Sequence, residues 1–438
     1  MKYKNSPWER NVDAPSFPML SKNIQTDVVV IGAGITGVLT AYMLAKHGKK
    51  VVVLEKNKIG FGATGLTTAF LTQSIDTDAE NLIDILGKKD SELLLGSHHM
   101  AIDTVEQIIQ DEKIDCEFIR CSNYTYGLEE KDVKTLEEES KQLKQLNVRN
   151  VFTEKSRDDL DFKHVGVIEI KNQAKFHPLK FLYAVVQACE KMGVEFYEKS
   201  EAKKVEDIQV GSTKFKKVVT SKGTVEAEWI ISATYSPFKE PLELYLKKGM
   251  YTSYVFELEI PHGSIAEGLY EDTYNPYHYF RIDKKDGKDR MIIGGEDNKN
   301  TFPVDPKKHF SALEEYIKKQ FPGLEYEKVY EWSGPILEPS DGFPSIGPAS
   351  EDKDDRLLYA FGFSGNGMTY STIAAHIMSD HILGNKNQYA HIFKTSRWMH
   401  VQGLVKKAKD YTGEFVGGVL KDVFKREHED DADQKKSS

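Results

Sequence analysis

The sequence predicts an α/β fold that begins with a nucleotide-binding β-α-β unit. Residues 28–31 form a buried-strand pattern, residues 35–46 show an apolar helical periodicity, and residues 51–54 form a second buried strand. Both strand segments are rich in Val, Ile and Leu, as is typical of strands that are covered on both faces of a parallel sheet. Gly48 ends the helix between them.

A glycine-rich turn joins the first predicted strand to the helix. Gly32, Gly34 and Gly37 form the pattern GxGxxG. Their positions allow a tight turn, close approach of the backbone to a pyrophosphate, and close packing of the helix on the strand. Ile35 and Thr36 open the helix, whose free N–H groups and partial positive charge favour phosphate. The alternative is a glycine turn that only packs, and the strand before it and the helix after it argue against that.

An acidic residue closes the second predicted strand. Glu55 stands at its end and Lys56 follows. A carboxylate at this place can accept both hydroxyls of a ribose and would repel a 2′-phosphate. The unit therefore predicts NAD or FAD as the ligand.

The composition narrows the class of protein. The 438 residues are 39% hydrophobic and 11% aromatic, which excludes a disordered or fibrous chain. The net charge of −9 would repel a phosphate backbone, so no nucleic-acid partner is expected. The three cysteines, Cys116, Cys121 and Cys189, form no metal or disulfide pattern and predict a reduced, cytoplasmic protein. No signal peptide or transmembrane segment is expected, because Val28–Ile31 is far too short to cross a bilayer.

Three further segments resemble the D-amino-acid-oxidase-like family of FAD-dependent oxidoreductases, which includes glycine oxidase and sarcosine oxidase. They are IGFGATGLTTAFLTQ at residues 59–73, NQAKFHPLKFLYAVVQACEKMGVEFYEKSEAKKVE at 172–206, and EWSGPILEPSDGFPSIGP followed by LLYAFGFSGNGMTYSTIAAHIMSDHILG near the C-terminus. The resemblance implies FAD in a discontinuous FAD-binding Rossmann-like domain of the glutathione-reductase type. It also implies a second, α+β substrate domain built on an antiparallel sheet.

The resemblance also implies how the chain divides. The FAD-binding domain is expected at residues 21–95, 150–240 and 325–395. The substrate or cap domain is expected at 96–149 and 241–324. Residues 396–438 are expected to form a helical tail with a disordered end.

Individual cofactor contacts follow from the resemblance. Residues of the 59–73 segment contact the isoalloxazine and the diphosphate, Val205 lies beside the adenine, and residues 233–234 reach the cofactor edge. A helix that starts near residue 368 stabilises the negative charge of reduced flavin. An ordinary Gly/Ser/Thr loop is the alternative for 59–73. The implied contacts are Gly62, Ala63, Thr64, Thr67, Thr68, Val205, Ala233, Thr234, Gly342, Gly362, Gly365, Asn366, Gly367 and Met368.

The predicted roof strand YHYFR supplies the catalytic candidates. Strand alternation places Tyr277, Tyr279 and Arg281 on one face and His278 on the other, and Tyr254 comes from a neighbouring strand. Arg281 can clamp a substrate carboxylate through two parallel hydrogen bonds, or it is a structural arginine. His278 can act as a base, or it is a hydrogen-bonded structural histidine.

The sequence departs from the family at three places. The arginine that amino-acid oxidases carry just before the DG-P-IG motif is absent from GPILEPSDGFPSIG, which weakens the expectation of amino-acid specificity. Ile292 stands where sarcosine oxidase has an oxygen-activating lysine, which favours an acceptor other than oxygen. No cysteine lies near residues 335–345 to bond to the flavin, so we expect non-covalent FAD.

We therefore expect an enzyme that removes a hydride from a small amine or amino-acid-like substrate, by CH–NH oxidation. The hydride reduces FAD, and the electrons pass to oxygen or another acceptor. The alternatives are a 2-hydroxy-acid dehydrogenase on the same scaffold and a non-catalytic flavin electron-relay protein.

The tail is the least familiar segment. The segments SPWERNVDAPSFPMLSKNIQTDVVVIG, GATGLTTAFLTQ and NQAKFHPLKFL resemble flavoproteins that carry a C-terminal Rieske domain. The cluster of that domain needs two cysteines, and no cysteine follows Cys189. Apolar and basic residues at helical spacing in 396–438 suggest an amphipathic helix on a membrane surface or on a separate electron acceptor. The alternative is a helix packed on the body of the protein, followed by a disordered acidic end.

Overall fold

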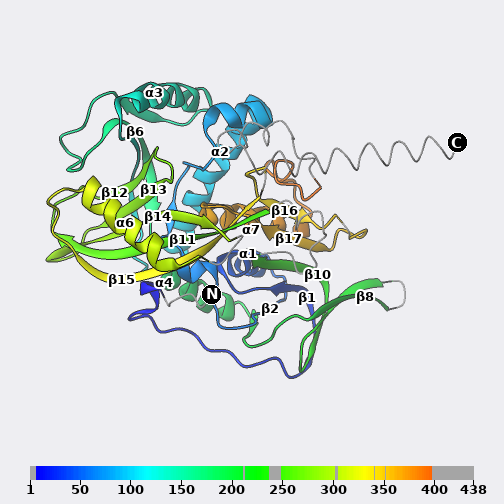
Figure 1. Cartoon of the computed structure of the whole chain (residues 1–438). Coiled ribbons are helices and arrows are strands. Elements are labelled where there is room, and N and C mark those ends of the chain that lie inside the picture. Colours follow the sequence, from blue (N-terminus) through cyan, green and yellow to red (C-terminus); the bar gives the residue numbers. More distant parts are fainter. Residues whose placement is uncertain are drawn as a thin grey trace, which may run out of the picture. The chain divides into compact units, whose positions relative to one another are not determined.

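The computed structural model describes residues 6–210, 213–235, 248–300, 304–339, 341–350 and 352–396. Two β-sheets organise this part of the chain (Figure 1), which confirms the predicted α/β class. Beyond Ser396, the expected C-terminal tail lies outside the described residues.

The first sheet is the predicted nucleotide-binding sheet. Its order is β16-β17-β10-β1-β2-β7, and β9 and β8 extend it from β10. The pairs β1–β10, β1–β2, β2–β7 and β10–β17 are parallel. The strands are β1 (Asn23–Ile31), β2 (Val51–Leu54), β7 (Glu195–Tyr197), β8 (Lys204–Val210), β9 (Thr213–Val219), β10 (Thr224–Tyr235), β16 (Ser345–Pro348) and β17 (Leu357–Phe361).

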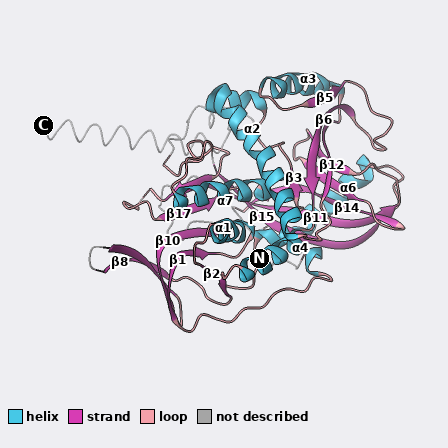
Figure 2. Cartoon of the chain, turned by 180° about the vertical axis from the view of Figure 1, so that it is seen from behind, coloured by secondary structure: helices cyan, strands magenta, loops and turns pink. Residues whose placement is uncertain are grey.

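Both faces of this sheet are buried, as its run of Val and Ile residues predicts. Val28 and Val30 join one apolar cluster with α1 (Ile35–Lys46), α4 (Pro178–Lys191) and α7 (Gly367–Leu383). Val29 and Ile31 point to the opposite face and join a second cluster. Helix α1 packs against α4 and α7 (Figure 2). The β-α-β unit thus has the predicted bounds for its helix and its second strand.

The second sheet is mostly antiparallel and runs in the order β15-β11-β14-β13-β12-β4-β6-β3, with β5 paired to β6. The predicted roof strand YHYFR falls in β13 except for Tyr277, which directly precedes it. The strands are β3 (Phe70–Leu71), β4 (Ile119–Gly127), β5 (Asn150–Thr153), β6 (Val165–Lys175), β11 (Lys248–Pro261), β12 (Gly268–Asp272), β13 (His278–Asp283), β14 (Lys288–Lys299) and β15 (Glu327–Pro339).

The remaining helices have different partners. Helix α2 (Ala79–Glu112) packs against α7, α3 (Glu130–Gln145) packs against β6, and α6 (Pro306–Gln320) packs against β11 and β14. Short 3-10 helices form η1 (Pro7–Glu9) and η2 (Ala63–Leu66). Among the described residues, no helix combines the length and apolar character needed to cross a membrane.

The division between the two sheets differs from the expected domain boundaries. Strands β3, β5, β6 and β15 fall in ranges expected for the FAD-binding domain, yet they pair within the second sheet. For example, β15 is hydrogen-bonded along β11, from Lys248 opposite Pro339 to Glu259 opposite Glu327. The expected ranges followed sequence motifs, which indicate contacts with the cofactor. They do not show which strands pair, and strand pairing determines the sheet to which a segment belongs.

Candidate active site

A cavity of about 650 Å³ lies where the parallel strands end and the second sheet begins. Residues that end or directly follow β1, β2, β10 and β17 line one side, and residues of β11, β12, β13 and β15 line the other. Ligands of open parallel sheets bind at the carboxyl ends of the strands, so the position is that of a nucleotide cofactor.

The glycine turn is shaped for close backbone approach. Gly32 has φ +105°, and a Cβ there would collide with the carbonyl oxygen of Ala233. A Cβ at Gly37 would collide with the carbonyl oxygen of Gly32, so this glycine lets α1 pack on the turn and does not line the cavity. Both positions match what a pyrophosphate-binding turn requires.

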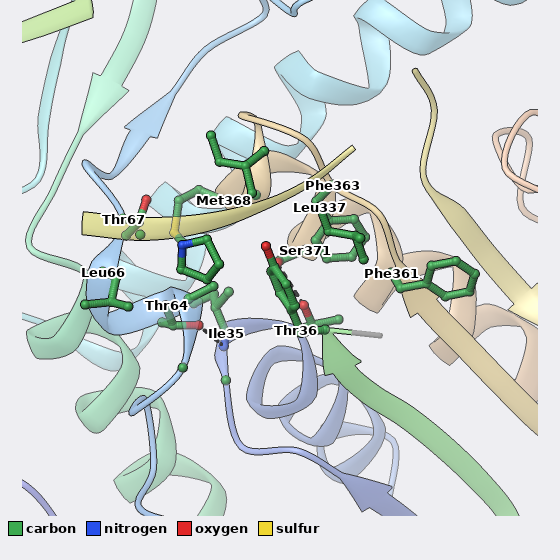
Figure 3. Close-up of a pocket in the computed structure, with 18 of the residues that line it drawn as sticks. Ile35, Thr36, Thr64, Leu66, Thr67, Leu337, Phe361, Phe363, Met368 and Ser371 are labelled. Carbon is green, nitrogen blue, oxygen red and sulfur yellow. Dashed lines mark hydrogen bonds between the residues drawn. The ribbon is translucent and has the colours of Figure 1, made fainter. Parts of the chain in front are cut away.

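Two helices begin at this one cavity. The Thr36 hydroxyl of α1 and the Ser371 hydroxyl of α7 lie 2.8 Å apart, which joins the two helices near their N-terminal ends (Figure 3). Neither helix has a side-chain cap at its N-cap residue, Gly34 or Asn366. Both helix starts line the cavity, so their partial positive charges act on the same space. The arrangement suits a ligand that is anionic at two separate places.

The acidic residue after β2 is held in place by backbone groups. Glu55 Oε2 accepts a hydrogen bond from Ala33 N at 3.0 Å, and Oε1 accepts one from Asn57 N at 2.7 Å. Glu201 and Ala202 line the same end of the cavity. The carboxylate is thus oriented at the place where an adenosine ribose is expected.

Two tryptophans hold the η2 segment in place, and this segment lines the middle of the cavity. Trp8 Nε1 donates to the carbonyl oxygen of Thr67 at 2.7 Å, and Trp332 Nε1 donates to that of Leu66 at 2.9 Å. Thr64 Oγ1 accepts from Ile35 N at 3.0 Å, which joins this segment to the start of α1. Segments far apart in the sequence therefore hold one wall of the site rigid.

Most of the expected cofactor residues line the cavity together. Val205 does not, because it lies in the β8–β9 hairpin and packs against the apolar cluster beside it. Gly342 does not either, since it belongs to a turn in which its N–H bonds to Pro339 O. Those that line it are Gly32, Gly34, Ile35, Thr36, Glu55, Lys56, Gly62, Ala63, Thr64, Thr67, Thr68, Ala233, Thr234, Gly362, Gly365, Asn366, Gly367 and Met368.

This fold and cavity define a flavin-dependent oxidoreductase. The family model described as "DAO: FAD dependent oxidoreductase" matches residues 27–381, and the chain belongs to this family. Its members bind FAD, and the glycine turn, the two helix starts and the oriented Glu55 fit that cofactor.

Known proteins support the assignment over most of the chain. The putative Rieske 2Fe-2S iron-sulfur protein YhfW of Bacillus subtilis is 32% identical over 417 residues, which cover 94% of this chain and 79% of that protein. Gamma-glutamylputrescine oxidoreductase of Escherichia coli is 27% identical over 394 residues, or 85% of this chain and 87% of that enzyme. The crystal structure of glycine oxidase from Geobacillus kaustophilus has the same fold, with a TM-score of 0.70, 19% identity, and coverage of 86% of this chain and 100% of that one.

Two tyrosines of the second sheet line the far end of the cavity. Tyr277 and Tyr279 lie there with their rings 5.7 Å apart, and the Tyr279 hydroxyl lies 2.9 Å from the Ser253 hydroxyl. Burial raises the pKa of both tyrosines, so both phenols stay neutral near pH 7. His278 points to the other face, as strand alternation predicts.

Gly294 makes room for one of these tyrosines. It pairs with Tyr279 across β13 and β14, and a Cβ at Gly294 would lie 2.6 Å from the Tyr279 hydroxyl oxygen. Gly294→Ala is therefore expected to lower the free energy of unfolding by about 1–3 kcal/mol, the usual effect of overpacking. Chemical denaturation measures this. The loss should disappear in a Tyr279→Ala background, and an equal loss in both backgrounds would contradict the predicted collision.

Arg281 lies away from the cavity, which argues against the expected substrate clamp. Its side chain is 1% exposed, and Nε and Nη2 bond to the carboxylate of Asp283. Nη1 donates to the carbonyl oxygens of Thr68, Ala69 and Phe176. Because these contacts occupy the guanidinium, we assign Arg281 a structural role beneath the η2 segment.

His278 and Tyr254 also lie outside the cavity lining. His278 Nδ1 is 3.2 Å from Asp272 Oδ2, its Nε2 is 3.1 Å from Glu296 Oε1, and its ring stacks on Tyr316. Tyr254 is buried and donates to Asn298. Its strand neighbours line the cavity instead, since alternation turns Tyr254 to the other face. Both residues are therefore better explained as structural.

Sequence reasoning missed two carboxylates at the tyrosine end. Asp76 and Glu271 line the cavity, and Asp76 accepts from Gly365 N at 3.2 Å. Glu271 lies on β12 opposite Tyr279 of β13. The alternation of side chains along β12 could have indicated that Glu271 faces the cavity. Its position beside the tyrosines, however, depends on the pairing of β12 with β13.

Proposed function

We propose that this chain oxidises a small amine or amino-acid-like substrate at the C–H bond beside its nitrogen. One observation carries the proposal: a single cavity joins the cofactor-binding turn, the two helix starts and the tyrosine end. The name of the Escherichia coli relative, an oxidoreductase of gamma-glutamylputrescine, supports an amine substrate.

FAD, when bound, would supply the redox chemistry by accepting a hydride. The ammonium form of the substrate would first release a proton to solvent, which leaves a neutral amine. Loss of the hydride from the carbon beside the nitrogen would leave an iminium, and water would hydrolyse it to a carbonyl compound and an ammonium or alkylammonium ion. The chain would position the substrate beside Tyr277 and Tyr279 and restrict water around it.

The α7 start has a further role in the proposal. The negative charge that reduction places on a flavin is stabilised by the partial positive charge of a helix N-terminus. Residues 365–368 at the start of α7 line the cavity, and together with Gly362 they would serve this purpose. The α1 start then holds the diphosphate.

We also propose that FAD is held without a covalent bond. None of the described residues that line the cavity is a cysteine or histidine, the side chains that most often form such bonds. Acid precipitation should release all of the yellow cofactor into the supernatant. A cofactor that stays with the precipitate would contradict this part of the proposal.

The function is tested by reducing the flavin anaerobically. Amines, amino acids and 2-hydroxy acids are added in turn to the FAD-loaded protein, and bleaching of the visible flavin band is followed. Bleaching by a nitrogen-bearing substrate supports the proposal. Bleaching by 2-hydroxy acids alone would indicate the hydroxy-acid alternative, and reduction only by a partner protein would indicate an electron relay.

Admitting air after the flavin has been reduced tests which molecule accepts its electrons. Ile292 is buried, and the described residues lining the cavity include no lysine at the tyrosine end. We therefore expect slow reoxidation by oxygen and faster reoxidation by an added quinone or dye. Rapid reoxidation by oxygen alone would identify an oxidase instead.

A further inference from the structure

We infer that the site selects a cationic amine that carries no carboxylate, and that Glu271 is the residue that receives the ammonium group. The inference rests on the proposed function and narrows its substrate class. It depends on three features of the tyrosine end: its charge, the hydrogen bonding of Glu271, and the aromatic rings beside it.

The charge-bearing side chains that line this end of the cavity are carboxyl groups; burial raises the pKa of Glu271, and a bound cation would favour its charged form. Asp76 and Glu271 both line this end, whereas Lys56, beside Glu55 at the opposite end, is the one basic side chain among the described residues that line the cavity. Arg281 is held by Asp283 and backbone carbonyls. A substrate carboxylate would therefore meet two carboxylates and no described cation, which is unfavourable in a poorly solvated site.

Hydrogen bonds to one carboxylate oxygen of Glu271 fix the orientation of its side chain. Its Oε1 accepts hydrogen bonds from Ser74 Oγ, from Asn123 Nδ2 at 3.0 Å and from Thr125 Oγ1 at 2.8 Å. No group in the described part of the chain donates to Oε2. The second carboxylate oxygen can therefore accept a hydrogen bond from a ligand in the cavity. An ammonium group suits this oxygen, because it has N–H donors and no acceptor.

The aromatic rings at this end suit the same ligand. Tyr279 pairs with Glu271 across β12 and β13, and Phe70 lies 5.9 Å from the Tyr279 ring, edge to face. Tyr277 adds a third ring to the lining. Ring faces attract ammonium groups and accommodate alkyl chains, whereas they offer nothing to a carboxylate.

A further carboxyl group adds to the negative potential. Burial, and after it the Asp76 charge among other effects, raises the pKa of Asp297 to about 6, and no described residue donates a hydrogen bond to its buried Oδ1. Burial, and after it the Asp297 charge, raises the pKa of Tyr277 and Tyr279. A bound cation would relieve the repulsion among these carboxyl groups.

Binding tests the inference without turnover. Tert-butylamine is cationic near neutral pH and has no C–H bond beside its nitrogen, so it cannot be oxidised; pivalate has the same shape and the opposite charge. Each is titrated into the FAD-loaded protein by calorimetry, with the flavin spectrum followed in parallel. We expect tert-butylamine to bind and pivalate not to bind. Equal or tighter binding of pivalate would overturn the inference.

Glu271→Gln tests the assigned residue. The amide keeps an oxygen for Ser74, Asn123 and Thr125 but removes the charge, so tert-butylamine should bind about tenfold or more weakly, as expected for the loss of a charge-assisted hydrogen bond. Glu169→Gln is the matched control, because Glu169 also accepts from a serine hydroxyl in this sheet but does not line the cavity. An unchanged affinity in Glu271→Gln, with the flavin spectrum intact, would overturn the assignment.

Turnover separates this inference from the proposed function. n-Butylamine and norvaline differ only by the carboxylate on the carbon beside the nitrogen. Faster anaerobic bleaching by n-butylamine supports both proposals. Faster bleaching by either enantiomer of norvaline would keep the proposed function and overturn the inference. If neither compound nor any other amine bleaches the flavin, the proposed function itself fails.

Discussion

Gly32→Ala is expected to yield a protein that no longer retains FAD. The residue has φ +105°, which L side chains rarely adopt, and its new methyl group would collide with the carbonyl oxygen of Ala233. Relief of the collision must move the turn or the end of β10, and both line the cofactor cavity. We expect FAD affinity to fall at least about a hundredfold, since misplacing the turn removes several hydrogen bonds to the diphosphate at once.

The measurement is FAD content after purification, followed by titration of the apoprotein with FAD. Gly96→Ala provides the control, because Gly96 lies within α2 and a Cβ there meets nothing within 4 Å. That substitution should leave FAD binding unchanged and stabilise the protein slightly. FAD retention equal to that of the wild type in Gly32→Ala would contradict the assigned role of the turn.

Trp8→Ala is expected to lower the free energy of unfolding by about 3–5 kcal/mol, the range for removing a large buried aromatic side chain. Trp8 is fully buried, and the guanidinium groups of Arg281 and Arg290 lie 5.2 and 5.1 Å from the centre of its ring. Its indole N–H also holds the carbonyl of Thr67. The substitution should therefore weaken FAD binding as well, because the η2 segment loses an anchor.

Thermal and chemical denaturation of the FAD-loaded protein measure this effect. Trp8→Phe provides a graded comparison, since it keeps an aromatic ring and removes only the indole N–H and part of the volume. We expect its loss of stability to be less than half that of Trp8→Ala. Wild-type stability in Trp8→Ala would show that the N-terminal segment does not support the site.

Trp8 also lies above a buried ionic cluster that Arg281 joins. Lys175 is 1% exposed and lies 3.0 Å from Asp283, which also pairs with Arg281 and Arg290. These cations hold the pKa of Asp283 well below its usual range, against the opposing effect of burial. Removing one partner from such a cluster leaves an uncompensated buried charge. The cluster explains why Arg281, which was predicted to bind the substrate, has a structural role.

The cofactor half of the site could be predicted from the sequence, because its signals are local. The GxGxxG turn, the Glu55 that follows the next strand and the glycines before α7 each specify a backbone conformation within a few residues. The bounds of α1 and β2 followed from periodicity alone. Among the residues expected at the cofactor, Gly37, Val205 and Gly342 do not line the cavity, and Gly37 instead lets α1 pack on the turn.

The substrate half could not be predicted in the same way, because it depends on strand pairing. Alternation correctly separated Tyr277 and Tyr279 from His278, but it could not show that Arg281, further along the same face, is covered by Trp8 and paired with Asp283. Glu271 reaches the cavity only because β12 pairs with β13. The pairing of β15 with β11 likewise decided the boundary between the sheets.

The central claim is that two helix starts and one glycine turn hold a single FAD. It is tested most directly by purifying the protein, recording its visible spectrum, and measuring the FAD released on denaturation. The account predicts a yellow protein that contains, or takes up on addition, one equivalent of FAD. A colourless protein that does not bind added FAD would contradict it.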